Sequence, residues 1–323
     1  MTVREVARGA AGGAGKRPLA VAMGITADLA FAAATVLLGL RRYPPCEAFD
    51  VVLFHGGVPP RDLAGLSSIH PCRPVAYRCP EPIVRNLPAD TLRAFSGQVF
   101  AKYECFELLR SYSRVVWLDA DILVRGDTAE ILDRCRDGAA FARESRPLRF
   151  NFTCDLDGFD MDRPFCNTGV FALSDRLPGW ANAKEWLVEA SLRYADRAVM
   201  GEQGILNLWL QHQRVEPVEL LPEYNVFRHR PGADRARIVH AVGHHKPWMD
   251  FGDATWNRDY ERWLAMGGTP CPVTKTVRFM ATRRPNPLRH PGELPSRAAQ
   301  IAGFALRRAV LARRARRTPP AAP

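Results

Sequence analysis

The sequence predicts an α/β fold built on a mostly parallel central sheet, and two observations support this prediction. From Leu19 onward, short apolar runs that fit buried strands alternate with longer stretches of helical periodicity. Parallel strands need a crossover of helical length between them, and this alternation supplies one. The composition, 47% hydrophobic and 24% charged residues, is that of an ordinary globular protein and excludes disordered, collagen-like and membrane-bundle classes.

The first elements are defined by apolar runs with small residues between them. Leu19 to Ile25 is apolar throughout, as a strand covered on both faces is, and an Ala-rich helix is expected from Leu29 to Arg42. Asp50 to His55 repeats the buried-strand pattern before two glycines. A membrane span over Pro18 to Leu40 is the alternative, but Asp28 would then lie near the bilayer centre at a cost of roughly 2.5 to 3.5 kcal/mol.

Extended and helical patterns alternate again in the second part of the chain. Val99 to Tyr112 carries aromatic and leucine side chains at three-to-four spacing, which predicts one amphipathic helix. Arg114 to Leu118 is a run of Val, Val, Trp and Leu and predicts a buried strand. Further helices are expected at 184–194 and 202–211, and a last short strand at 238–241.

Composition divides the chain into three parts. Residues 1–17 are rich in Gly, Ala and Arg and are expected to be disordered, 18–270 to form one domain, and 271–323 to form a basic Pro/Arg/Ala-rich tail. From Pro272 to Pro323 there are twelve basic side chains and one acidic one, which accounts for the whole net charge of +11. Because the rest of the chain is electrically balanced, we expect no nucleic-acid partner.

The tail has two interpretations. Between Ser296 and Arg317, apolar side chains recur at helical spacing among arginines. This pattern is typical of an interfacial helix on an anionic membrane. A solvated basic tail is the alternative, because Arg308 falls within the apolar stripe.

Cysteine spacing indicates the compartment. The eight cysteines form no C-x-x-C pair and no zinc-binding pattern. We therefore expect a reduced, cytoplasmic protein, with peripheral contact to the inner face of the membrane if the tail binds there.

Two carboxylates follow the strand predicted at 114–118. Asp119 and Asp121 are two residues apart, so the alternation of an extended chain would place both side chains on one side. A surface Asp pair is the plainer alternative. However, like charges this close favour a cation, hard oxygen ligands suit Mn²⁺ or Mg²⁺, and ligands of open α/β sheets bind at the carboxyl ends of strands. We expect Trp117 to be a core residue that points away from the pair.

Three further segments combine polar side chains with a glycine or a cation. One joins an amide, a hydroxyl and a glycine that permits close backbone approach. One places an acid and an amide at a helix start, and one joins an imidazole, a glycine and a lysine suited to phosphate. In chain order they are Asn167-Thr168-Gly169, Glu202-Gln203, and His240 with Gly243 and Lys246.

Together with the Asp-x-Asp pair, these segments resemble glycosyltransferase family 8, the glycogenin and lipopolysaccharide galactosyltransferase type. The resemblance runs from Leu19 to Trp248, with four motifs in family order at family spacing. It implies a GT-A fold, a UDP-sugar donor (UDP-glucose or UDP-galactose), Mn²⁺ (or Mg²⁺), and transfer of a hexose with retention of anomeric configuration. The acceptor hydroxyl, on a glycan, a lipid-linked saccharide or a protein, stays open.

The resemblance also implies roles for individual residues. The metal ligands are Asp119, Asp121 and His240, and the diphosphate contacts are Gly243 and Lys246. The nucleobase segment is Thr26, Ala27, Asp28 and Phe31, with Phe31 where the family usually has Tyr. The donor-sugar pocket is Lys102, Asn167, Thr168, Glu202 and Gln203. Asp119, Asp121, Lys102 and Gln203 are expected to take part in catalysis. Glu202 stands where the family commonly has Asp, which leaves the identity of the sugar open.

Other interpretations compete with these roles. His240 and Phe31 also fit core positions, and Lys102 also fits the solvated face of a helix. Because Gln203 is a poor nucleophile, front-face substitution is favoured over a covalent intermediate.

Two other functions compete with sugar transfer. A haloacid-dehalogenase-type phosphatase also ends an apolar strand in Asp-x-Asp, but Leu123 and Ile131 stand where its pattern needs other residues. The second is a non-catalytic member that binds nucleotide or glycan.

Overall fold

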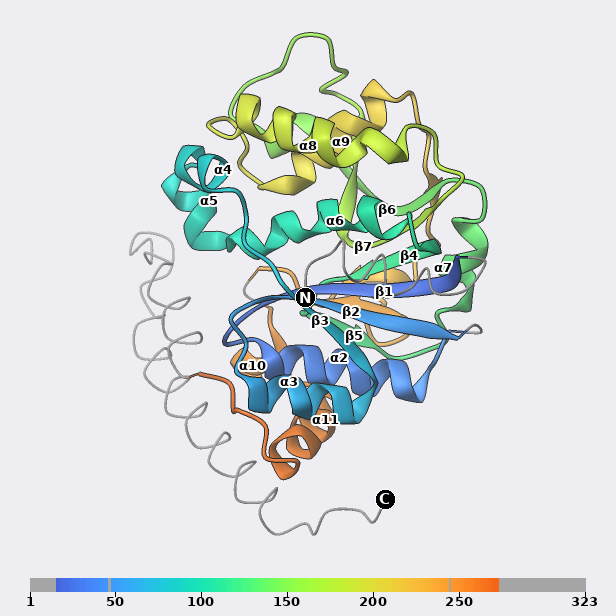
Figure 1. Cartoon of the computed structure of the whole chain (residues 1–323), viewed down its shortest axis with the longest axis vertical. Helices are drawn as coiled ribbons and strands as arrows, with labels where there is room; N and C mark the ends of the chain where they lie inside the picture. Colours follow the sequence, from blue (N-terminus) through green and yellow to red (C-terminus); the bar gives the residue numbers. More distant parts are fainter. Residues whose placement is uncertain (1–15, 46–47, 244, 273–323) are drawn as a thin grey trace.

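The structure is a computed structural model that describes residues 16–45, 48–243 and 245–272. Its centre is a seven-stranded sheet with helices on both faces (Figure 1). The strands are β1 (Arg17–Thr26), β2 (Phe49–Gly56), β3 (Cys72–Ala76), β4 (Tyr112–Leu118), β6 (Ala139–Pro147), β7 (Pro164–Ser174) and β8 (Val218–Glu219). They are ordered β3-β2-β1-β4-β7-β6-β8, and only the pairs that include β7 are antiparallel. The predicted mostly parallel α/β sheet is confirmed.

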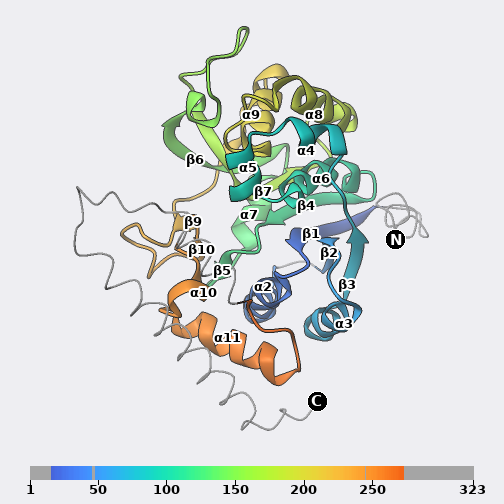
Figure 2. The ribbon, with the colours of Figure 1, turned by 90° about the vertical axis from the view of Figure 1, so that its left-hand side faces the viewer.

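A second, three-stranded sheet packs beside the first. Its strands are β5 (Ile122–Val124), β9 (Tyr224–Phe227) and β10 (Ile238–His240), in the order β5-β10-β9. Figure 2 shows these strands beside the short helix α10 (Pro247–Asp250). Because only three residues separate the end of β4 from the start of β5, the chain passes directly from the large sheet to the small one.

Helices cover the two faces of the large sheet (Figure 1). One face carries α2 (Ala30–Arg42), α3 (Pro60–Ile69) and α11 (Ala254–Ala265), and the other carries α6 (Glu104–Leu108), α8 (Trp180–Tyr194) and α9 (Glu202–His212). Shorter pieces are α4 (Glu81–Asn86), α5 (Ala89–Ala94), α7 (Ala129–Arg134) and the 3₁₀ segments η1 (Gly97–Tyr103) and η2 (Leu148–Asn151). Alternate residues of β1 enter alternate cores: Leu19 and Val21 lie in the first, Ala20 and Ala22 in the second.

Most predicted elements are confirmed, but the single helix over Val99–Tyr112 is wrong. The segment is split into η1 and α6, and Tyr112 already opens β4, where it pairs with Arg17 of β1. A 3₁₀ turn aligns side chains three residues apart, so Phe100 and Tyr103 share a buried face. Lys102 is also buried rather than solvated.

The described residues also bear on the predictions about the ends and the compartment. The first strand begins at Arg17, one residue earlier than composition predicts, whereas residues 1–15 and the basic stretch after Pro272 lie outside the described part. Within that part no helix has the length and apolarity of a membrane span, since Pro18 to Leu40 is divided between β1 and α2. Its seven cysteines are all free.

Candidate active site

Two segments 120 residues apart meet at the carboxyl end of β4. The chain leaves β4 at Leu118, turns through Asp119 and Asp121, and enters β5. Because β5 pairs antiparallel with β10, Ile122 lies opposite His240, and the amide of Ala241 donates to the carbonyl of Asp121 over 3.0 Å. The predicted convergence of the carboxylates is therefore produced by a turn and a small sheet rather than by strand alternation.

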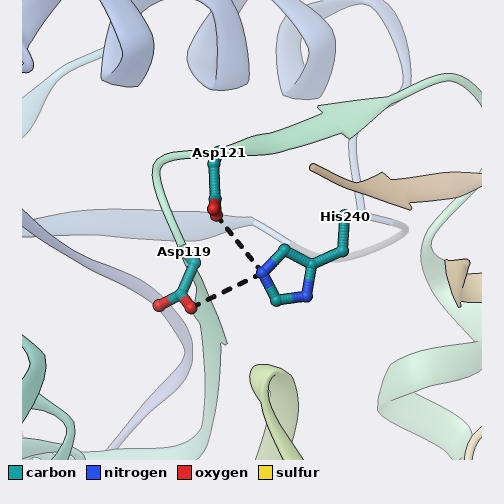
Figure 3. Close-up of side chains that lie close together, drawn as sticks. All are labelled: Asp119, Asp121 and His240. Atoms are coloured by element: carbon teal, nitrogen blue, oxygen red, sulfur yellow. Dashed lines mark ion pairs between the residues drawn. The ribbon is translucent and has the colours of Figure 1, made fainter. Parts of the chain in front are cut away.

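Figure 3 shows the result, in which both carboxylates point at one nitrogen of the imidazole. His240 Nε2 lies 3.3 Å from Asp121 Oδ1 and 3.8 Å from Asp119 Oδ2. One ligand atom from each of the three residues lies within 4.8 Å of the others. We call these three residues, together with Lys246, the metal corner.

The donor set of the metal corner fits a hard divalent cation. Asp121 Oδ1 is buried and has no hydrogen-bond partner among the described residues. Two carboxylates and an imidazole nitrogen are ligands that Mn²⁺ accepts. A buried carboxylate oxygen without a hydrogen bond is costly unless a cation meets it, so the residues present match the ion that the resemblance implies.

Lys246 supplies one positive charge at this corner. Its ammonium group pairs with Asp121 Oδ2. Burial alone would raise the pKa of Asp121, but Lys246 and, to a smaller extent, the neighbouring His240 together outweigh burial and hold that pKa well below its usual range. Gly243, three residues earlier in the same loop, is exposed and has a φ of +59°, a conformation that glycine adopts without strain.

The predicted sugar-pocket residues form a second cluster. Lys102 Nζ lies 2.5 Å from Glu202 Oε1 and 3.2 Å from Asp119 Oδ1. The hydroxyl of Thr168 donates to Glu202 Oε1 over 3.0 Å. Burial alone would lower the pKa of Lys102, but the two carboxylates outweigh burial and raise it. We call Lys102, Thr168, Glu202 and Gln203 the ion-pair corner.

The amide of Gln203 is held at both ends. Its Nε2 donates to Asn151 Oδ1 over 2.8 Å, and its Oε1 accepts from the backbone amide of Thr168 over 3.3 Å. Asn167 lies beside it on β7, 7% exposed, and its Oδ1 accepts from the amide of Gly169 over 2.9 Å. The structure thus brings all five predicted sugar-pocket residues next to the metal corner.

The predicted nucleobase segment follows β1 at the same edge of the sheet. Thr26 Oγ1 donates to Asp28 Oδ1 over 2.5 Å, and Ala27 between them is exposed. Phe31 is 1% exposed and packs edge-on against Trp248, with ring centroids 5.3 Å apart. A planar base can therefore contact Phe31 only if a neighbouring ring moves. Of the two interpretations that the sequence allows for Phe31, nucleobase contact and core residue, the structure shows the core position.

Two residues near the site were missed or misplaced by sequence reasoning. Trp117 is a core residue as expected, stacked on Phe171, but its indole N–H donates to Asp119 Oδ1 over 2.7 Å. The expectation that it points away was wrong, because residues two apart on a strand share a side. Asn225, whose Oδ1 lies 2.8 Å from His240 Nδ1, carried no sequence signal.

Solved structures resemble this fold at low sequence identity. The galactosyltransferase LgtC, in complex with donor and acceptor sugar analogues, matches with a TM-score of 0.61 at 16% identity, over 76% of this chain and 99% of LgtC. The bifunctional glycosyltransferase WbbM, in its apo form, matches with a TM-score of 0.55 at 15% identity, over 84% of this chain and 52% of WbbM. The likeness shows a GT-A fold.

Sequence comparisons agree with the fold. Glycosyltransferase GlyA of Streptococcus pneumoniae serotype 4 is 20% identical over 168 residues, which are 50% of this chain but only 23% of GlyA. The sequence pattern of glycosyl transferase family 8 matches residues 20–252, a span that holds the metal corner, the ion-pair corner and the nucleobase segment. The chain therefore belongs to glycosyl transferase family 8 and is a glycosyltransferase.

Proposed function

We propose that the enzyme transfers a hexose from a UDP-sugar, UDP-glucose or UDP-galactose, to an acceptor hydroxyl with retention of configuration and with the help of Mn²⁺ or Mg²⁺. The observation that carries the proposal is the convergence of Asp119, Asp121 and His240 on one point, with Asp121 Oδ1 buried and without a hydrogen bond to any described residue. Family membership decides against the phosphatase alternative.

The metal corner would hold the cation and the donor diphosphate together. When bound, the cation supplies Lewis-acid stabilisation of the departing diphosphate. Lys246 pairs with Asp121 and would exchange this partner for a phosphate oxygen. The exposed amide of Gly243 adds a backbone donor in the same loop.

In the transfer step, the bond between the anomeric carbon and the β-phosphate oxygen breaks and the acceptor oxygen bonds to the same carbon. The acceptor proton passes to the departing phosphate oxygen on the same face of the sugar. The bonding electrons of the broken bond leave with the diphosphate, so the step balances without another reactant.

The ion-pair corner favours front-face substitution over a covalent intermediate. Glu202 is committed to Lys102 and Thr168, and a carboxylate held in this way is a weak nucleophile. The amide of Gln203 is fixed by Asn151 and Thr168, so it would orient the sugar rather than attack it. Lys102, Asn167 and Thr168 would line the same pocket.

The nucleotide would lie along the end of β1. Asp28 is held by Thr26 and would accept a hydrogen bond from the uracil, while exposed Ala27 leaves room beside it. Phe31 would support this segment indirectly, by packing against Trp248.

The acceptor would be a glycan, a lipid-linked saccharide or a protein hydroxyl. LgtC, solved with donor and acceptor sugar analogues, supports a saccharide acceptor. The basic stretch after Pro272 would allow peripheral contact with an anionic inner membrane surface, where lipid-linked acceptors are found.

Incubation of the full chain with each UDP-sugar, Mn²⁺ and a cell extract tests the proposal. We expect release of UDP, a product one hexose heavier, and an anomeric configuration that equals that of the donor. Glu81→Gln, which changes an exposed ion pair, is the matched control for Asp121→Asn. Binding of UDP-sugar without turnover would favour the non-catalytic alternative, and an inverted product would contradict the retaining mechanism.

A further inference from the structure

We infer that Asn225 is a positioning residue that holds His240 as the Nδ1–H tautomer, with the lone pair of Nε2 facing Asp119 and Asp121. This inference rests on the proposed metal-binding role of His240. Asn225 lies on β9 and is 7% exposed, and its amide oxygen is 2.8 Å from His240 Nδ1. It would act on the metal site through the imidazole.

The direction of the hydrogen bonds follows from a backbone amide that can only donate. Gly169 N–H lies 2.9 Å from the side chain of Asn167, so the atom that it meets there is the oxygen, Oδ1. The side chain of Asn225 lies 2.9 Å from the same oxygen. Only an NH₂ group can donate to it, and therefore Nδ2 of Asn225 faces Asn167.

The other end of the Asn225 amide is then fixed as an acceptor. Its oxygen faces His240 Nδ1, and a carbonyl oxygen cannot donate, so the proton lies on Nδ1. In a neutral imidazole the second nitrogen then carries a lone pair. That nitrogen is Nε2, the atom 3.3 Å from Asp121 Oδ1.

The backbone conformation at Asn225 is irregular in a way that suits the contact with His240. Tyr224 and Val226 pair with Ile238 and Val239, which are adjacent, so Asn225 is an extra residue in β9. Bulges of this kind re-aim a side chain. Its φ of +78° lies in the left-handed region, which asparagine and aspartate tolerate better than most residues.

Gly169 connects the same hydrogen-bond chain to the carboxylate side of the metal corner. Its carbonyl accepts from the backbone amide of Asp119 over 2.9 Å. A Cβ at Gly169 would lie 2.0 Å from His240 Cε1, so the imidazole packs directly on this glycine. One residue of β7 therefore fixes the positions of both kinds of ligand.

NMR of the metal-free full chain with ¹⁵N-labelled histidine tests the inference, because the two ring nitrogens report their protonation separately. The spectra are recorded at pH 9, above the ordinary imidazole pKa of roughly 6.5, and the His240 signals are assigned by their loss in His240→Gln. The variants are Asn225→Gly, which tolerates the positive φ but lacks the amide, and Asn225→Asp, which tolerates it and keeps an acceptor. Mn²⁺ affinity of each is measured by the EPR signal of the free ion.

We expect the Nδ1–H tautomer in the unmodified chain and in Asn225→Asp, and loss of that preference in Asn225→Gly. Mn²⁺ affinity should fall about 10- to 100-fold in Asn225→Gly and less in Asn225→Asp. An Nε2–H or doubly protonated ring in the unmodified chain would overturn the inference without the use of any variant. Retention of the tautomer in Asn225→Gly, or equal Mn²⁺ affinities of the two variants, would also overturn it. Absence of Mn²⁺ binding in the unmodified chain would instead contradict the proposed function, while the tautomer still decides the inference.

Discussion

The metal corner and the ion-pair corner lie side by side but differ in how far their polar groups are satisfied by the protein itself. In the ion-pair corner every side chain meets a partner of the protein itself, and Lys102 neutralises Glu202 at 2.5 Å. In the metal corner Lys246 pairs with Asp121 alone, and a buried oxygen of Asp121 has no hydrogen bond to any described residue. The polar groups of the first are satisfied by the protein's own residues, whereas the second presents a donor set that suits a cation.

This difference separates what each corner contributes. Loss of a ligand in the metal corner should affect turnover more than stability, because it removes a donor to the cation. Loss of a partner in the ion-pair corner should destabilise the fold, because it leaves a buried charge uncompensated. Asp119 touches both corners, through Lys102 at 3.2 Å and through His240 at 3.8 Å, and couples them.

The largest effect is expected from the metal corner. Asp121→Asn and His240→Ala should each lower kcat/KM by about 10³-fold, because each removes most of the stabilisation of the departing diphosphate. The double variant should be hardly worse than either single one, since the second change has little left to remove. The measurement is kcat/KM for the three variants at saturating Mn²⁺, after circular dichroism has confirmed that each is folded.

Simple additivity of the Asp121 and His240 effects, to within about 0.5 kcal/mol, would contradict a shared ion. His240 would then be a structural histidine, and the metal corner would reduce to a carboxylate pair.

The ion-pair corner should instead respond in stability. Lys102→Met leaves Glu202 buried beside Asp119 and should lower the free energy of unfolding by about 3 kcal/mol. Burial raises the pKa of Glu202 and Lys102 opposes that rise, so without Lys102 the folded state takes up a proton more readily. The deficit should therefore be larger at pH 8 than at pH 5, as measured by urea denaturation at both pH values.

Glu81→Gln in the exposed Arg85–Glu81 pair is the control and should change stability by less than about 1 kcal/mol. If Lys102→Met matched this control, the ion-pair corner would not be the self-supporting structure that its geometry indicates.

Asp28 lies outside both corners and should behave independently of them. Asp28→Ala should raise the KM for the donor about tenfold and change kcat less, because a nucleobase contact is equally present in the ground state and the transition state. Donor titrations in the unmodified background and in Asp121→Asn measure this. A strong dependence of the Asp28 effect on Asp121 would show that the nucleobase segment and the metal corner act as one unit.

The smallest effect concerns the basic stretch after Pro272. If it binds anionic membranes, the full chain should sediment with anionic liposomes at low salt and less at high salt. A chain that ends at Pro272 is the matched comparison, because Thr269 and Cys271 still bond to the domain. Equal sedimentation of the two would remove the membrane role and leave a solvated tail.

The parts of the fold that were predictable from sequence are those with long, uniform patterns. The strand at Leu19–Ile25 was predictable because its apolar run is short and continuous. The helix at Leu29–Arg42 was predictable because its apolar run is longer and rich in alanine. The split of Val99–Tyr112 was not, because a periodicity of three to four residues fits both a 3₁₀ turn and an α-helix. The strand Pro164–Ser174 was not predicted, because its polar Asn167 and Thr168 interrupt the apolar run.

In the site, too, features with a local sequence signal were predictable, and those that depend on contacts between distant residues were not. Asp119 and Asp121 follow an apolar strand, which is a local signal. Their link to His240 required the family resemblance, because the short β5–β10 pairing that joins them leaves almost no pattern. Asn225 had no signal at all, since its role depends on a bulge and on hydrogen bonds to residues distant in sequence.

The central claim is that the metal corner needs a cation before it can hold a nucleoside diphosphate. Thermal unfolding with UDP, in Mn²⁺ and in EDTA, tests it most directly. UDP at 100 times its dissociation constant should add about 2.7 kcal/mol to the free energy of unfolding in Mn²⁺, or roughly 4 °C in Tm for a chain of this size. It should add almost nothing in EDTA or in Asp121→Asn. An equal rise of Tm in Mn²⁺ and in EDTA would contradict the claim.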